Sequence, residues 1–137
     1  MTDLDQSGNG YQQVMAYNGP SLGWVLTRVK PQVAVTSASY TVQPGDSILL
    51  VNRAGVVTIL LPSVARWVKE TAYNPSVGFE RAIFIKDYGG NAATFNITVT
   101  PNGADTIDAL AMSFTIVQNR QLLRLYPLND LSGWFSG

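Results

Sequence analysis

From Trp24 to the end of the chain, short runs of apolar and β-branched residues alternate with turns rich in Pro, Gly, Asn and Asp. This alternation limits the possible folds more than any other feature of the sequence. Short strands with a turn roughly every 8–12 residues are typical of antiparallel sandwiches, jelly rolls and small barrels. We therefore predict an all-β fold: a single antiparallel sandwich or jelly-roll-like domain of about eight to ten strands.

The strand positions follow from β-type residues and from the turns that bound them. Across the short links Ala54-Gly55 and Asn119-Arg120, the flanking runs are predicted to pair as hairpins. Residues 94–100 alternate between apolar side chains on one face and Thr or Asn on the other. The candidate segments for these eight to ten strands are residues 24–29, 33–36, 40–42, 47–52, 56–61, 81–86, 94–100, 106–108, 113–118, 121–126 and 133–136.

One short helix is predicted at about residues 63–71. Ser63 is a suitable N-cap, and Val64, Trp67 and Val68 would share one face at helical spacing. A helix of about two turns is stable only when it packs against other structure. We therefore expect that face to contribute to the core.

Residues 1–23 differ in composition from the rest and form the predicted extended N-terminal arm, ahead of a β-domain at 24–137. The arm is rich in Gly, Asn, Gln and Ser, and such a segment buries too little apolar area to fold alone. Two interpretations stay open: a disordered tail, or an arm that orders on a neighbouring subunit. In the second, the attachment residues are Tyr11, Val14, Met15, Tyr17 and Leu22.

Charge and cysteine content exclude several kinds of site. The 137 residues suit one domain, and the nine basic and nine acidic side chains cancel, so no nucleic-acid partner is expected. No cysteine is present, which excludes disulfides and thiolate metal sites. We expect no signal peptide and no membrane span. Because only 13% of residues are charged and 46% are apolar, we expect a partner to cover part of the surface.

The residues needed for most catalytic sites are missing. Without histidine, Ser-His-Asp and Cys-His machinery and His-ligated metals are excluded, and no nucleotide-binding glycine motif occurs. Asp105 and Asp108 are the only acids close in sequence within the predicted domain, and they fit a turn better than a hydrolase or calcium site. We predict no enzymatic activity and no cofactor. The three tryptophans lie in apolar patterns, which favours packing over a sugar-binding platform.

A series of short motifs between residues 40 and 135 occurs in a specific order. They are YTV at 40–42, GDSILLVN at 45–52, VTILLP at 57–62, IFIKDYGGNA at 83–92, ITVTP at 97–101, DTID at 105–108 and GW at 133–134. This order resembles a small β-domain of bacteriophage virion proteins, found in head decorations, head fibres and tail-fibre or spike modules. Two departures are Ala109-Leu110, where the family usually has Gly, and a longer segment between Pro62 and Arg81 that carries the helix.

The resemblance implies a structural protein on the outer surface of a virion, made in the host cytoplasm. We expect a capsid decoration or cement protein that binds and stabilises the head shell. Its partners would be the major capsid protein or other virion subunits and copies of itself, with a trimer favoured over a dimer. The alternative is a head-fibre or tail-fibre tip module that binds a host receptor or glycan.

Overall fold

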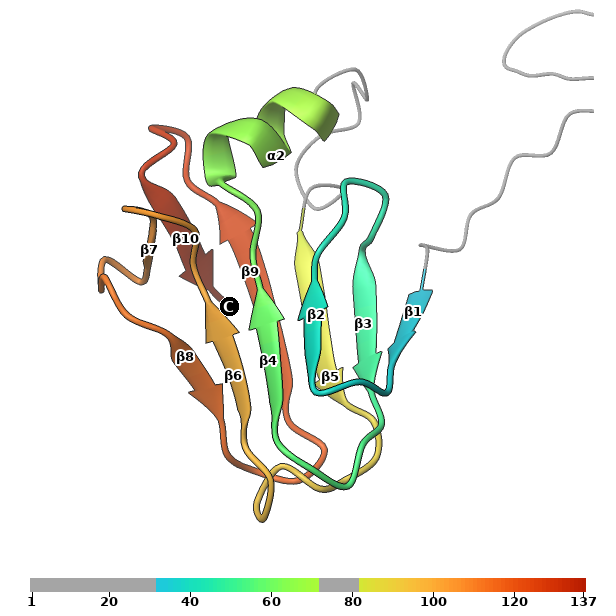
Figure 1. The fold of residues 1–137 in the computed structure, drawn as a ribbon. Helices are drawn as coiled ribbons and strands as arrows, with labels where there is room; N and C mark the ends of the chain where they lie inside the picture. The colour runs from blue at the N-terminus through green and yellow to red at the C-terminus, as the bar shows by residue number, and fades with distance from the viewer. Residues whose placement is uncertain (1–31, 72–81) are drawn as a thin grey trace, which may run out of the picture. The chain divides into compact units, whose positions relative to one another are not determined.

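The computed structural model describes residues 32–71 and 82–137, and all structural statements refer to these residues. The predicted arm and the predicted strand at 24–29 lie outside them. Ten strands and one helix form here (Figure 1). Their bounds are β1 Gln32–Val35, β2 Ser39–Thr41, β3 Ile48–Val51, β4 Val57–Leu60, α2 Val64–Thr71, β5 Ile83–Asp87, β6 Ile97–Thr100, β7 Thr106–Ile107, β8 Phe114–Ile116, β9 Leu122–Pro127 and β10 Gly133–Ser136.

The strands form two sheets that face each other. One sheet has six strands in the order β1-β3-β5-β9-β10-β7, and the other has four in the order β2-β4-β6-β8. Through the first six strands, the chain changes sheet after every strand (Figure 1). The prediction of a mostly β, sandwich-like fold with one short helix is therefore confirmed.

The prediction of an antiparallel arrangement is wrong for five of the eight strand pairs. β1, β3 and β5 pair in parallel, as do β2, β4 and β6, and β7 with β10. Antiparallel pairs join β5 to β9, β9 to β10 and β6 to β8. Parallel pairing follows from the alternation between sheets, because the chain returns to each sheet in the same direction after crossing the other. The jelly-roll arrangement stays a prediction.

Both predicted hairpins are also wrong. β3 and β4 belong to different sheets, so the Ala54-Gly55 link crosses between the sheets instead of closing a hairpin. The same is true of β8 and β9 across Asn119-Arg120. A short link with Gly marks a reversal of the chain, but it does not determine whether the next strand pairs with the one before it.

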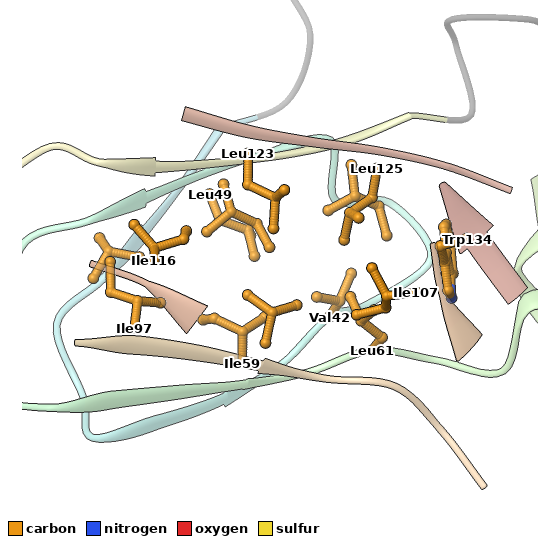
Figure 2. Close-up of a cluster of buried hydrophobic side chains, with 14 of the residues drawn as sticks. Val42, Leu49, Ile59, Leu61, Ile97, Ile107, Ile116, Leu123, Leu125 and Trp134 are labelled. Atoms are coloured by element: carbon orange, nitrogen blue, oxygen red, sulfur yellow. The ribbon is translucent and has the colours of Figure 1, made fainter. Parts of the chain in front are cut away.

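The core fills the space between the two sheets, where apolar side chains point toward one another (Figure 2). Every strand contributes through the period-2 alternation of β structure, with inward residues such as Leu49, Ile59 and Val99 fully buried. Trp67 of α2 and Trp134 of β10 meet at one end of this core, with ring centroids 6.1 Å apart. Both are at most 1% exposed, which confirms the packing interpretation for these two tryptophans.

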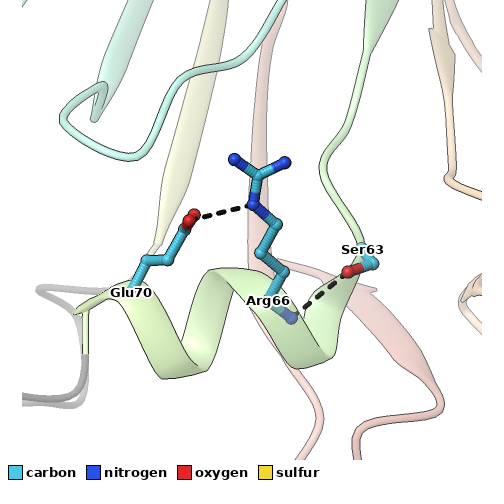
Figure 3. Close-up of polar contacts among 3 residues, drawn as sticks. All are labelled: Ser63, Arg66 and Glu70. Carbon is cyan, nitrogen blue, oxygen red and sulfur yellow. Dashed lines mark hydrogen bonds and ion pairs between the residues drawn. The ribbon is translucent and has the colours of Figure 1, made fainter.

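Helix α2 is capped as predicted. The N–H of Arg66 donates to Ser63 Oγ at 3.2 Å, and the Arg66 guanidinium forms an ion pair with Glu70 at 2.9 Å (Figure 3). Val64 and Trp67 are buried, and Val68 packs against the core. A long-range contact adds to the cap, because the N–H of Val64 donates to Asp105 Oδ2 at 2.8 Å. The helix is therefore fixed at its N-terminus by a side chain from the β6–β7 link.

Candidate functional site

The outer face of the four-stranded sheet carries rows of hydroxyl side chains. The strand register aligns Ser39, Thr58, Thr98 and Thr115 across β2, β4, β6 and β8. Because the residues beside them in sequence point into the core, these four side chains point outward. The face thus has a continuous row of small hydroxyl groups.

A second row lies two residues further along each strand. Thr41, Leu60 and Thr100 are aligned across β2, β4 and β6, and the hydroxyls of Thr100 and Ser113 are 3.0 Å apart. Neither row contains a charged side chain. Leu60 is 37% exposed, so part of this surface is apolar. A partner that covers the face would not have to desolvate a charge.

A junction between two links lies away from this face, around the buried carboxylate of Asp87, which is 2% exposed. Its Oδ1 accepts hydrogen bonds from the N–H groups of Gly90 and Asn91, at 3.1 and 3.2 Å. Its Oδ2 accepts from the N–H groups of Ala92 and Arg120, both at 3.0 Å. One side chain thereby fixes the β5–β6 link and joins it to the β8–β9 link.

The Asp87 junction favours the ionised carboxylate. Burial raises the pKa of Asp87, but the four backbone N–H donors outweigh burial and hold the pKa below its ordinary value of 3.8. The negative charge of Asp87 is therefore stabilised by hydrogen bonds inside the protein and adds little to the charge of the outer surface. This arrangement was not predicted, because the sequence showed only a turn after residue 86.

Asp105 and Asp108, the acids considered for catalysis or calcium binding, make separate structural contacts. Asp105 caps α2, as described above. Asp108 accepts hydrogen bonds from the N–H and the hydroxyl of Ser136, at 2.8 and 2.5 Å. In the described part of the chain, no group of three or more acidic side chains is placed to hold a metal ion.

A groove of about 230 Å³ lies between the β2–β3 turn and the first turns of α2. The charges in its polar wall cancel, because the Arg66 guanidinium forms an ion pair with Glu70. The residues that line it are Thr41, Val42, Gln43, Pro44, Leu61, Pro62, Ser63, Arg66, Glu70 and Asn102. It is smaller than a typical pocket for a drug-sized ligand.

The predicted arm residues Tyr11, Val14, Met15, Tyr17 and Leu22 lie outside the described residues. Within residues 32–71 and 82–137, no helix has the length and apolar character needed to cross a membrane. No protein-family model matches the chain, and a comparison with curated protein sequences gives no match.

Proposed function

We propose that this protein is a structural component of a bacteriophage virion, a decoration or cement protein that binds the outside of the capsid shell. The supporting sequence observation is the order of motifs between residues 40 and 135. The supporting structural observation is the uncharged outer face of the four-stranded sheet, defined by the rows around Thr58 and Thr98. A catalytic role has no comparable support, because Asp105 and Asp108 are engaged in separate structural contacts.

The chemistry of this face suits attachment to another protein. Hydroxyl groups and exposed apolar atoms form hydrogen bonds and van der Waals contacts without the desolvation penalty of charged groups. Threonine also suits a flat outward sheet face, because its β-branched side chain is stiff and loses little freedom on binding. We propose that this outer face of the four-stranded sheet lies against a shell subunit.

The area of this face limits how tightly it can bind a partner. With four strands about 4.8 Å apart and two rows about 6.6 Å apart, the face covers about 250 Å². A stable interface buries about 800 Å² on each partner. One face alone therefore gives a weak contact, and tight binding requires a second contact or several copies engaged at once. A homo-oligomer, with a trimer favoured, on a repeating shell meets this requirement.

Substitution of Thr98 by lysine tests this face. Thr98 lies in the centre of the hydroxyl row, so a lysine there would place a charge in the proposed contact. We expect the T98K variant to fold normally and to bind emptied phage shells at least tenfold more weakly, as measured by cosedimentation. Asn129→Lys adds the same charge in the exposed β9–β10 turn and should bind like the wild type. Equal binding by T98K and wild type would remove this face from the interface.

A fibre-tip module that binds a glycan is the second candidate, favoured by the balanced polar groove beside α2. Its Arg66–Glu70 pair and the amides of Gln43 and Asn102 offer both donors and acceptors, which suits neutral hydroxyl groups. A glycan array separates the two candidates. Specific hits that disappear in an Asn102→Ala variant would favour the fibre module, and an array without hits would leave shell attachment as the better account.

A further inference from the structure

Three links between strands meet at one end of the described domain: residues 52–56, 88–96 and 117–121 (Figure 1). Hydrogen bonds fix these links to one another. The Asn91 side chain donates to Arg53 O at 3.2 Å, and the N–H of Ala93 donates to Asn119 Oδ1 at 2.8 Å. The Asp87 carboxylate joins the second and third links, as described above. This end of the domain is therefore ordered before any partner binds.

Arg120 is held in place by several independent features. Its backbone has φ 68°, a left-handed conformation that costs a residue with a side chain about 1–2 kcal/mol. The backbone N–H of Arg120 donates a hydrogen bond to the Asp87 carboxylate. The backbone carbonyl of Arg120 accepts a hydrogen bond from Lys86 Nζ. Backbone strain of this kind persists only where surrounding contacts enforce it, and it is common at functional positions.

The guanidinium of Arg120 is positioned as well. Its Nη1 donates to the carbonyl of Tyr88 at 2.6 Å. A side chain at Gly90 would place its Cβ 2.8 Å from Nε of Arg120, so the guanidinium occupies space that only glycine leaves open. A guanidinium has five N–H donors, and this contact uses one of them. The remaining donors belong to an exposed residue whose orientation is already fixed.

The surroundings of Arg120 are positive and partly aromatic. Arg53, Lys86 and Arg120 all lie at this end, and none of them forms an ion pair with an acid of the described residues. Asp87 is buried and its carboxylate is occupied by four N–H groups. Next to Arg120, Tyr88 is 55% exposed. Arg and Tyr are among the residues that contribute most to binding energy at protein interfaces.

We propose that Arg120 and Tyr88 form a second contact surface that binds a carboxylate side chain, Asp or Glu, of a partner protein. A fixed guanidinium fork matches the two oxygens of a carboxylate, and the exposed tyrosine ring supplies apolar contact beside it. A nucleic acid is less well matched, because the nine basic and nine acidic residues of the chain cancel. This surface goes beyond the proposed shell attachment, since it does not depend on the partner being a capsid subunit.

NMR titration of the isotope-labelled full-length protein with a glutamate-rich peptide tests this surface. We expect peptide-dependent shifts at the Arg120 side-chain N–H and at the amides of Tyr88 and Gly90, which weaken as salt is added. The R120Q variant should bind the peptide at least fivefold more weakly. R120K, which keeps the charge but loses the fork, should fall between the two.

Arg124→Gln is the matched control, because it removes the same charge from an exposed residue of β9 away from the three links. It should bind the peptide like the wild type. Tyr88→Ala provides a second variant and should weaken binding without removing the charge. Absence of shifts at Arg120, or equal losses in R120Q and R124Q, would overturn the proposal. Tighter binding of a single-stranded oligonucleotide at the same residues would also overturn it, in favour of a nucleic-acid surface.

Discussion

Replacement of Trp134 by alanine is expected to lower the free energy of unfolding by about 3–5 kcal/mol. Trp134 is fully buried on β10, where it packs against Trp67 and is aligned with Ile107 of β7. Removing the indole would leave a cavity between α2 and the end of the six-stranded sheet. Since small domains are stable by only about 5–15 kcal/mol, the W134A variant should be close to unfolding at room temperature. Urea denaturation followed by circular dichroism measures the loss.

Phe135 gives the matched comparison. It is the next residue on the same strand, but its side chain points outward and is 43% exposed. Its ring stacks on that of Tyr126, with centroids 5.1 Å apart. The F135A variant should lose about 1 kcal/mol, which is the scale of an exposed aromatic pair. If W134A and F135A lose similar amounts, Trp134 is not a central part of the core.

Replacement of Asp87 by alanine is expected to destabilise the protein by about 3 kcal/mol at neutral pH, because four backbone N–H groups would lose their acceptor. The loss should be concentrated in the links that Asp87 connects. The amide hydrogen-exchange rates of Ala92 and Arg120 should therefore increase more than those in the centre of β4. Urea denaturation gives the total loss, and exchange measured residue by residue gives its location.

The Asp87 contribution should also depend on pH. Its folded-state pKa is depressed, so the stabilisation is complete well above pH 3.8 and is lost as the pH falls below that value. The difference in stability between wild type and D87A should therefore be constant from about pH 6 to 8 and should shrink below about pH 4. A difference that grows as the solution is acidified would contradict the assigned ionisation.

Local elements of this fold could be predicted because each depends on nearby residues. The alternation of Ile97 to Thr100 defines an inward and an outward face in any sheet. Ser63, followed by Val64 and Trp67 at helical spacing, likewise defines the helix and its buried side. Pairing depends instead on distant segments. Gln32 pairs with Ile48, but Ile48 pairs with Phe84, because α2 and the segment after it are inserted between β4 and β5. The unequal spacing hides the repeated parallel crossings.

In the candidate sites too, features that depend on nearby residues could be predicted, and features that depend on distant segments could not. That Thr98 and Thr100 face outward was predictable, but the row that Thr98 forms with Thr58 and Thr115 depends on the strand order. The role of Asp87 was missed because one of its four donors, Arg120, comes from a remote link. A signal was present in the sequence: Asp87 is followed by Gly89 and Gly90, a turn in which an aspartate often accepts backbone N–H groups.

Mass spectrometry of purified phage particles is the most direct test of the proposed function. Particles from a lysate of cells that produce this chain would be separated from free protein on a density gradient, and each fraction would be analysed for its peptides. The account predicts that the chain sediments with intact heads in a fixed ratio to the major capsid protein, and that it rebinds to shells from which it has been removed. Its absence from purified heads, together with no binding to emptied shells, would contradict the account.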